Sequence, residues 1–472
     1  MGNSNASNAA AITGFRTQDP RTNEIIETFS YFSDDEVTDV LLTVEGASKS
    51  WRARSIAERA VVARRIADLL HEQREDLAHT ATLEMGKALD QVDAEIQECI
   101  DIFQYYADNG PHLAAEQVLV DDSDRRAVLQ RKPLGVILGI MPWNFPYYQV
   151  ARFVAPNIVL GNAIVLKHAE TCPRSAIALE TVFRDAGLPD GVYQNLFVTH
   201  DQIERIIADD RIQGVSLTGS ERAGSAVAAT AGTHLKKVVL ELGGSDAHVY
   251  LSAEDPEAAA RSAFEMRMDN MGQACTSNKR LLVHEDFYEE FLAAIVRYAA
   301  TLEKGNPFVP QEGVYYPLSS ELAAPDLVEQ IDRAVQDGAT LHVGGDRLTT
   351  AGAWVRPAVL TGITPDMAAH HEEFFGTVLL LYKIRDEDEA VKLANDSPFG
   401  LAGAVFSQDY EQALRVAQQL DVGMSHVNIG GSEAADMPFG GVKRSGFGRE
   451  LGPLGIDEFV NKRLLYVKPS SA

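Results

Sequence analysis

The spacing of hydrophobic and polar residues predicts helices first and then a long alternation of strands and helices. Ser33-Asp-Asp-Glu36 and Ser55-Ile-Ala-Glu58 are capping boxes, and each precedes apolar residues at helical spacing. A third amphipathic helix is predicted from about Leu89 to Tyr106. We assign no chemistry to these helices.

Short apolar runs separated by helical segments fill most of the remaining chain. After a hairpin pattern at 117–131, the first series of predicted strands is 135–140, 163–167, 193–197, 214–217 and 238–240. The second series is 247–251, 281–283, 340–343, 378–384, 404–406 and 426–428. This order predicts an α/β fold of two doubly wound domains, with a boundary near 242–244 and with ligands at the carboxyl ends of parallel strands.

Composition and charge narrow the function classes. The 472 residues carry a net charge of −26, which disfavours binding to nucleic acid or to anionic membranes. The first residues are polar and unlike a signal peptide, and no apolar stretch is long enough to span a bilayer. The three cysteines are far apart without a CxxC pair, so neither a disulfide framework nor a metal site is expected. We expect a soluble protein of the cytoplasm.

Cys275 lies in Gln273-Ala-Cys-Thr-Ser-Asn-Lys-Arg280, among small and polar residues after a Gly-Gln turn. A reachable thiolate in such a setting is a good nucleophile for carbonyl carbon. The alternative is a small buried side chain without chemistry, which is the common fate of a lone cysteine. Other segments of the chain decide between the two.

Two further segments follow predicted strands of the first series. Asn144, in Met141-Pro-Trp-Asn-Phe-Pro146, is a candidate hydrogen-bond donor to an oxyanion, or a simple turn residue. Lys167 and Glu170 end the next strand, where they could bind two ribose hydroxyls or form a solvated pair. A carboxylate at Glu170 favours NAD over NADP because it repels a 2′-phosphate.

Glycine-rich turns supply the remaining candidates. Thr218-Gly-Ser-Glu-Arg-Ala-Gly224 opens a helix whose first N–H groups could bind a pyrophosphate. Glu241, in Glu241-Leu-Gly-Gly244, is a candidate general base or an ordinary surface glutamate. Segment 372–376 (EEFFG) and the glycine-rich segment 437–448 complete the set, and the latter could cover a site.

Together these segments resemble the NAD(P)-dependent aldehyde dehydrogenase superfamily in order and spacing, from about residue 12 to 468. The shared motifs are PWNFP, K-x-x-E, TGS-x-x-x-G, ELGG, GQ-x-C, EE-x-FG and PFGG-x-K-x-SG-x-G. The resemblance implies Cys275 as the nucleophile, Glu241 as the general base, and Asn144 with the Cys275 N–H as the oxyanion hole. It implies binding of NAD, with NADP possible, by Met141, Pro142, Trp143, Lys167, Glu170, Gly219, Ser220, Gly224, Leu242, Gly243, Glu373 and Phe375.

The resemblance also implies a division of the chain. A flexible tail at 1–12 precedes an NAD(P)-binding domain at 13–116 and 132–242. The catalytic domain is 243–428, and 429–454 is a return segment with a site-covering loop. The segments 117–131 and 455–472 look like an oligomerisation arm, so a homodimer or homotetramer is expected.

The substrate expected from the resemblance is an aldehyde, most closely succinate semialdehyde. Arg152 falls where some succinate-semialdehyde dehydrogenases carry a carboxylate-binding arginine, and the alternative is a helix arginine in a surface ion pair. Other aliphatic or ω-carboxylated aldehydes remain open. Glu241 disfavours the CoA-acylating branch, in which a thiol replaces activated water. A catalytically silent binding protein on this fold is the alternative from a different class.

Overall fold

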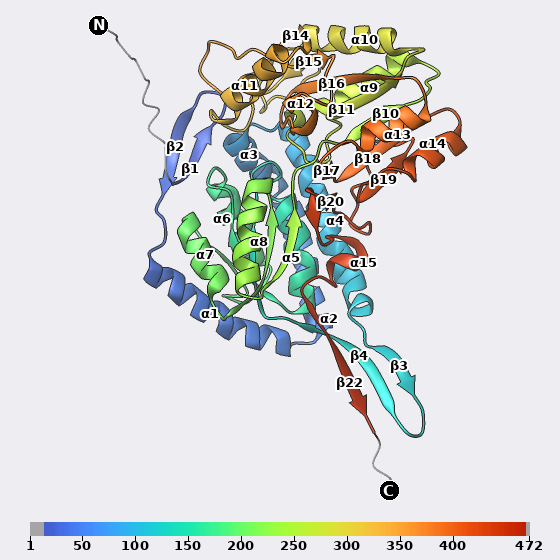
Figure 1. Ribbon diagram of the computed structural model, residues 1–472. Helices are drawn as coiled ribbons and strands as arrows, with labels where there is room; N and C mark the ends of the chain where they lie inside the picture. Colours follow the sequence, from blue (N-terminus) through green and yellow to red (C-terminus); the bar gives the residue numbers. More distant parts are fainter. Residues whose placement is uncertain (1–13, 469–472) are drawn as a thin grey trace.

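The computed structural model describes residues 14–468, so the tail predicted at 1–12 lies outside the described residues. Two α/β domains and a projecting three-stranded arm make up the described chain (Figure 1). Each domain has its own hydrophobic core: one contains Trp51 and Phe103, and the other contains Phe291 and Trp354. Two separate cores agree with the fold of two doubly wound domains predicted from the strand pattern.

The first domain is built on a six-stranded sheet. Its strands, in spatial order, are β21 (Gly446–Phe447), β9 (Lys237–Glu241), β8 (Ile212–Thr218), β5 (Val136–Ile140), β6 (Ala163–Lys167) and β7 (Tyr193–Asn195). All neighbours are parallel except β21, which joins β9 in the antiparallel direction. The return segment therefore contributes a strand to the first domain, with Gly446 opposite Glu241.

Eight helices and a hairpin accompany this sheet. The helices are α1 (Asp34–Ala53), α2 (Ile56–Glu72), α3 (Arg74–Met85), α4 (Leu89–Leu113), α5 (Tyr148–Leu160), α6 (Pro173–Asp185), α7 (His200–Ala208) and α8 (Glu221–Thr233). The hairpin is β1 (Phe15–Asp19) with β2 (Glu24–Phe29). Both predicted capping boxes, at Ser33 and Ser55, are present, and α4 continues seven residues beyond the predicted end at Tyr106.

The second domain is built on a seven-stranded sheet. Its strands, in spatial order, are β14 (Thr340–Val343), β15 (Ala358–Thr361), β16 (Val378–Ile384), β11 (Arg280–His284), β10 (Ala247–Tyr250), β18 (Ala402–Phe406) and β19 (Met424–Val427). Only β14 is antiparallel to its neighbour in this sheet. The chain thus passes from one sheet to the other between Glu241 and Ala247.

The remaining helices and short strands belong to the second domain and to its connections. The helices are α9 (Pro256–Met268), η1 (Asp269–Gly272), α10 (Tyr288–Thr301), α11 (Ala323–Gln336), α12 (Ala368–His371), α13 (Glu387–Asn395), α14 (Tyr410–Ala417) and α15 (Gly452–Gly455). The short strands are β12 (Glu303–Lys304), β13 (Val314–Tyr315), β17 (Phe399–Gly400) and β20 (Val442–Lys443). None of the helices in residues 14–468 is long and apolar enough to cross a membrane.

Strand order fixes where ligands can reach the first sheet. The central strand β5 pairs with β6 on one side and with β8 on the other, so the winding reverses at β5. Connections leave in opposite directions at such a point and open a crevice at the carboxyl ends of the strands. The segments after β5 and β8, which begin at Met141 and Gly219, both lie at this crevice.

The arm consists of β3 (Gln117–Asp121), β4 (Arg126–Pro133) and β22 (Val460–Val467). The predicted hairpin is present, and β22 pairs antiparallel with β4 along its whole length. The three strands extend away from both domains at the lower end of Figure 1. Residues 469–472, the end of the predicted arm, lie outside the described residues.

Candidate active site

The loop that carries Cys275 is held in an uncommon backbone conformation. Asn270, Met271 and Gly272 have φ values of +45°, +54° and +71°, in the left-handed region. A Cβ on Gly272 would lie 2.3 Å from the Gly376 carbonyl oxygen, so only glycine fits there. This fixed turn leads the chain from α9 back to Cys275 before β11 begins.

Asn144 joins the first domain to this loop. Its Nδ2 donates to the Gln273 carbonyl oxygen at 2.9 Å, and the Asn270 Nδ2 donates to the Asn144 carbonyl oxygen at 2.7 Å. An amide group carries two N–H donors, so one donor of Asn144 is left for a ligand. The carboxyl end of the first sheet therefore meets the segment that precedes the amino end of β11 in the second sheet, and the nucleophile lies at this junction.

Cys275 is half-buried and lies between two cavities, both of which it lines. Burial raises the pKa of its thiol to about 12, although the positive charges of Arg152 and Lys279 act to lower this pKa. Glu373 and Asp246 raise this pKa further because their negative charges oppose the thiolate. The charged residues around the thiol thus act in opposite directions.

Glu241 ends β9 and is buried, with 2% of its surface exposed. Neither carboxylate oxygen has a hydrogen-bond partner among residues 14–468. Burial raises the pKa of this carboxyl group well above its ordinary value, and the negative charge of Glu450 adds to the effect. A buried, unpaired carboxylate beside a cavity is suited to accept a proton from water.

The first cavity, of about 230 Å³, runs along the carboxyl ends of β5, β8 and β9; we call it the cofactor-side cavity. Trp143 and Phe375 meet edge to face in its wall, with ring centroids 5.7 Å apart. Its lining is Pro142, Trp143, Asn144, Gln149, Thr218, Gly219, Ser220, Glu241, Leu242, Gly243, Cys275, Glu373 and Phe375. The structure therefore brings together eight of the twelve residues that the resemblance implied for the cofactor, and with them all three residues that it implied for catalysis.

Four of the implied cofactor residues lie outside this lining. Met141 is buried, and its backbone N–H donates to the Lys167 carbonyl oxygen at 3.0 Å. Lys167 and Glu170 form an ion pair of 3.5 Å at the end of β6. Gly224 packs in the first turns of α8, where a Cβ would lie 2.6 Å from the Leu242 side chain. These positions support the walls or extend the crevice away from Cys275.

The cofactor-side cavity fits a dinucleotide in two respects. A Cβ on Gly219 would meet only the Leu217 side chain, at 3.7 Å, so the turn before α8 is open. Ser220 caps α8, leaving the first turn of a 13-residue helix at the cavity, as a pyrophosphate requires. The Glu373 carboxylate packs against Gly243, where a Cβ would lie 2.0 Å from the Glu373 Oε2, so a larger residue at this position would displace it.

The second cavity, of about 310 Å³, lies on the other side of Cys275; we call it the substrate-side cavity. Three aromatic rings, three carboxylates and Arg152 lie in its lining among smaller and polar residues. The lining is Glu98, Phe145, Tyr148, Gln149, Arg152, Met266, Asp269, Ala274, Cys275, Thr276, Ser277, Gly430, Gly431, Glu433 and Phe439.

Arg152 lines this cavity from α5 and is fully buried, so the alternative of a surface ion pair is wrong. Its Nε pairs with Glu450 of the return segment, and its Nη2 donates to the Thr218 Oγ1 at 3.4 Å. Within the described chain, its Nη1 has no partner. The pairing was not predictable because Glu450 is 298 residues away in the sequence.

Sequence reasoning missed two sets of residues at the site. Glu98, Asp269 and Glu433 form an acidic rim on the substrate-side cavity, and their segments share no motif. Lys279 lies beneath the nucleophile loop, with its Nζ 2.7 Å from the carbonyl oxygens of both Ala274 and Cys275. A lysine in the otherwise small and polar segment after Cys275 was the available signal.

Comparison with known proteins agrees with this geometry. The sequence model of the aldehyde dehydrogenase family matches residues 7–465. The chain belongs to the aldehyde dehydrogenase family.

Relatives within the family are similar over nearly the whole chain. A succinate-semialdehyde dehydrogenase [NADP(+)] of Deinococcus radiodurans is 49% identical over 456 residues, which cover 97% of this chain and 95% of the relative. A Mycobacterium avium protein of the same name is 39% identical, with 97% of each chain covered. Family membership therefore does not depend on a single conserved segment.

Solved structures share the fold. The succinic semialdehyde dehydrogenase of Streptococcus pyogenes in complex with NADP+ is 40% identical, with a TM-score of 0.93 over 97% of this chain and 100% of that one. The betaine aldehyde dehydrogenase of Staphylococcus aureus in complex with NAD+ is 29% identical, with a TM-score of 0.92 over 97% and 92%. The two-domain fold of this family is thus present here, and the chain is an NAD(P)-dependent aldehyde dehydrogenase.

Proposed function

We propose that this enzyme oxidises succinate semialdehyde to succinate, with Cys275 as nucleophile, Asn144 as oxyanion donor and Glu241 as general base. The observation that carries the proposal is the position of Cys275 between two cavities. Asn144 and Glu241 line the cavity on one side, and Arg152 lines the other. One cavity can therefore hold the cofactor and the other the aldehyde.

The first step joins Cys275 to the aldehyde. The Sγ, as thiolate, attacks the carbonyl carbon, and the carbonyl oxygen becomes an oxyanion. The free N–H of the Asn144 amide and the Cys275 N–H donate to this oxyanion. A thiohemiacetal results, with its carbon held between the two cavities.

The second half of the reaction releases the acid. A nicotinamide held in the cofactor-side cavity would supply the hydride acceptor, and loss of a hydride from the thiohemiacetal carbon would leave a thioester on Cys275. Glu241 takes a proton from water, and the hydroxide adds to the thioester carbon. Collapse expels the Cys275 thiolate and gives the carboxylic acid. Glu241 also supports hydrolysis over acyl transfer to a thiol.

The identity of the aldehyde rests on two kinds of support. The relatives at 49% and 39% identity are named for succinate semialdehyde. In this chain the Arg152 Nη1 is buried without a partner on the substrate-side cavity, where a substrate carboxylate could accept its hydrogen bond. Another aliphatic or ω-carboxylated aldehyde is the second candidate because the Glu450 carboxylate already neutralises Arg152.

Two residues at the end of β6 have opposite effects on the choice between NAD and NADP. Glu170 at the end of β6 disfavours a 2′-phosphate, while Lys167, 3.5 Å from it, attracts one. The names of the relatives specify NADP(+). We propose that both NAD and NADP serve, and kcat/KM measured with each cofactor gives their ratio.

The test of the proposed function is an assay of reduced nicotinamide with succinate semialdehyde and a panel of uncharged aldehydes, using both cofactors. We expect the highest kcat/KM with succinate semialdehyde. In Glu241→Gln, a burst of one reduced nicotinamide per site should precede slow turnover, because thioester hydrolysis becomes limiting. If no aldehyde is oxidised, the alternative of a catalytically silent binding protein replaces the proposal.

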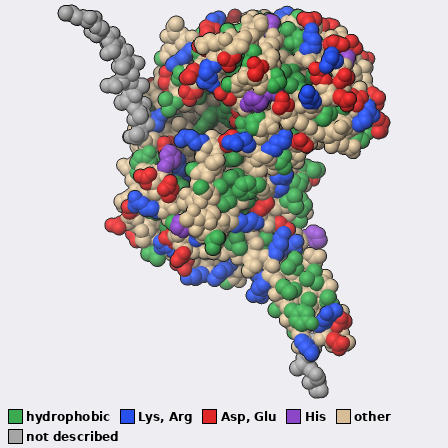
Figure 2. Space-filling view, in the orientation of Figure 1, with side chains coloured by type: hydrophobic (Ala, Val, Ile, Leu, Met, Phe, Trp, Pro, Cys, Tyr) green, Lys and Arg blue, Asp and Glu red, His purple; other side chains and the backbone are tan. Residues whose placement is uncertain are grey.

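We infer that the arm mediates homo-oligomerisation, to a dimer or tetramer. Apolar side chains gather on it in Figure 2, and Val118, Leu119, Leu464 and Tyr466 are each at least half exposed. Exposed apolar strands of this kind are covered in stable proteins, and the partner we propose is a second copy. In Leu464→Arg with Tyr466→Asp, light scattering should give a lower mass with an unchanged far-ultraviolet spectrum. An unchanged mass would contradict this role.

The proposed compartment is the cytoplasm. Cys99, Cys172 and Cys275 are all free thiols. A reducing compartment keeps a thiol nucleophile active. Localisation of a tagged chain by fractionation would test this assignment.

A further inference from the structure

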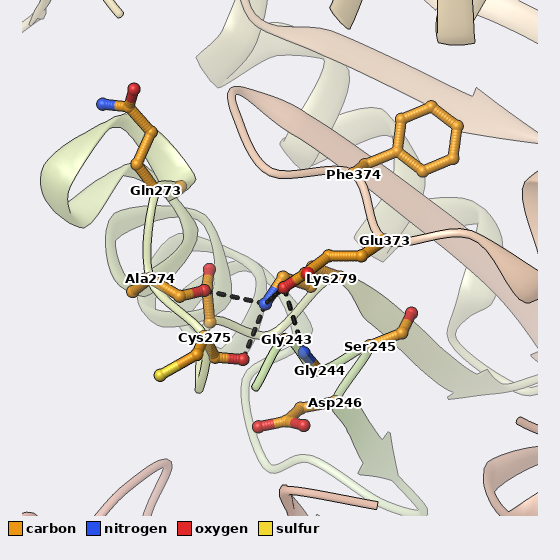
Figure 3. A network of polar contacts seen from close by, with 12 residues as sticks. Gly243, Gly244, Ser245, Asp246, Gln273, Ala274, Cys275, Lys279, Glu373 and Phe374 are labelled. Atoms are coloured by element: carbon orange, nitrogen blue, oxygen red, sulfur yellow. Dashed lines mark hydrogen bonds and ion pairs between the residues drawn. The ribbon is translucent and has the colours of Figure 1, made fainter. Parts of the chain in front are cut away.

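The Lys279 ammonium lies between the backbone of Ala274 and Cys275 and the Glu373 carboxylate (Figure 3). Its side chain is fully buried, and its Nζ donates to the carbonyl oxygens of Ala274 and Cys275, each at 2.7 Å. The third contact is an ion pair of 3.0 Å with the Glu373 Oε1. Two of the three contacts are hydrogen bonds to the backbone that carries the thiol, and the third is a contact between opposite charges.

The contact with Ala274 fixes the direction of the Cys275 N–H. The carbonyl of Ala274 and the N–H of Cys275 belong to one planar trans peptide, in which they point in opposite directions. A carbonyl held on the Lys279 ammonium therefore turns the Cys275 N–H away from Lys279. The contact with the Cys275 carbonyl holds the next peptide as well, so the residue is restrained on both sides.

Glu373 holds Lys279 from the opposite side. Its Oε1 forms the ion pair with the Lys279 Nζ at 3.0 Å and accepts a hydrogen bond from the Gly244 N–H, also at 3.0 Å. Figure 3 shows the carboxylate between Lys279 and Gly244. Glu373 also lines the cofactor-side cavity, so a surface of that cavity is linked to the nucleophile loop through one ion pair.

We propose that Lys279 is a positioning residue for Cys275: it orients the Cys275 N–H toward the oxyanion, and its charge, partly offset by Glu373, stabilises the thiolate. The assignment of Cys275 as nucleophile comes from the proposed function, and this inference rests on it. Lys279 touches neither cavity, so it acts only through the loop and through its charge.

The charges that face the thiol determine in which direction each substitution should shift the pKa of Cys275. Arg152 and Lys279 lower the pKa of Cys275, and Glu373 and Asp246 raise it. Glu241 lines the cofactor-side cavity together with Cys275. Removal of the Lys279 charge should therefore raise the pKa of the thiol, and removal of the Glu373 charge should lower it. A purely structural role for the ion pair would not give opposite shifts.

The first experiment measures the rate of Cys275 alkylation by iodoacetamide against pH, in the full-length enzyme without cofactor or aldehyde. Mass spectrometry of the Cys275 peptide separates this thiol from Cys99 and Cys172, and Cys275→Ala is the blank. The rate profile of Lys279→Met should move to higher pH and that of Glu373→Gln to lower pH. Unshifted profiles, or shifts of the same sign, would overturn the proposed electrostatic role.

The second experiment separates position from charge. Lys279→Arg keeps the charge, but its planar group cannot hold both carbonyl oxygens as the ammonium does. Its alkylation profile should stay close to that of the unmodified enzyme, while kcat falls about 10- to 100-fold with little change in KM. An unchanged kcat in Lys279→Arg would overturn the role in orienting the Cys275 N–H.

The two experiments also separate this inference from the proposed function. Alkylation needs neither aldehyde nor cofactor, so it tests the charges even if no aldehyde is oxidised. Glu373→Gln keeps the size and the hydrogen bond of the side chain, so its downward shift remains testable if Lys279→Met does not fold. Thermal unfolding of each variant identifies loss of folding.

Discussion

The two cavities that meet at Cys275 differ in what forms their walls. The cofactor-side cavity is lined by strand ends and glycine turns, and its charged lining residues are Glu241 and Glu373. The substrate-side cavity is lined by α4, α5, α9 and loops, with Arg152 and three carboxylates. Rigid strand ends suit chemistry common to all substrates, whereas side chains on helices and loops can vary with the substrate. We therefore expect changes in the first cavity to affect all aldehydes equally and changes in the second to discriminate among them.

Cys275 belongs to both cavities, so its replacement gives the largest effect. In Cys275→Ala no covalent intermediate can form, and turnover should fall by at least about 10⁴-fold for every aldehyde and both cofactors. Reduced nicotinamide formed in steady state measures this loss. Substantial residual oxidation of any aldehyde would show that the two cavities do not share this nucleophile.

Asn144 tests the cofactor-side cavity alone. Asn144→Ala removes the amide donor and should lower kcat by about 10²- to 10³-fold. The fold-change should be the same for succinate semialdehyde and butanal, because the oxyanion is common to both. A loss confined to one aldehyde would contradict the division of roles between the cavities.

The cofactor-side cavity was predictable because each of its segments follows a strand and has a recognisable local pattern. Asn144, Gly219 and Glu241 were named from short motifs, and the parallel sheet then brings the strand ends to one edge. Local sequence and sheet topology together specify this wall. That Cys275 lies close to these residues could not be read from the first sheet. Cys275 and Glu373 belong to the second sheet, where they precede β11 and β16 instead of following a strand.

The substrate-side cavity could not be predicted in this way. Arg152 was named, but whether it is free or paired depends on Glu450, which only the folded chain brings near. Glu98 and Glu433 come from a helix and a distant loop, and each alone resembles an ordinary surface glutamate. Lys279 was passed over because its function depends on which carbonyl oxygens surround it. Pairings between distant segments carry no local signal.

The pH dependence of turnover is the next effect in size. Glu241 and Cys275 both act in the deprotonated form, and burial raises the pKa of each, to about 12 for the thiol. Glu241 acts only after the hydride has left, so kcat/KM reports the Cys275 thiol, and it should increase about tenfold per unit between about pH 6.5 and 8.5. The same profile is expected with charged and uncharged aldehydes. A kcat/KM profile that is flat over this range would show that the Cys275 thiol is already ionised.

Arg152 tests the substrate-side cavity. Removal of Arg152 alone would leave Glu450 buried without its partner, at a cost of about 3–5 kcal/mol, so the matched variant is Arg152→Met with Glu450→Gln. The kcat/KM for succinate semialdehyde relative to butanal should fall about tenfold. The two substitutions also remove charges that act on the pKa of Glu241. That effect is common to both aldehydes, so it cancels in the ratio. Glu450→Gln alone is the control, and an unchanged ratio in the double variant would remove Arg152 from substrate recognition.

The acidic rim should give the smallest effect. Glu433 is exposed at the substrate-side cavity and repels an anionic aldehyde, but water and salt screen an exposed charge. Glu433→Gln should therefore lower KM for succinate semialdehyde about two- to threefold at low salt and leave KM for butanal unchanged. The difference should shrink as salt is added, because screening already weakens the repulsion in the unmodified enzyme. Equal changes for both aldehydes would mean that Glu433 shapes the cavity mouth rather than selecting substrates by charge.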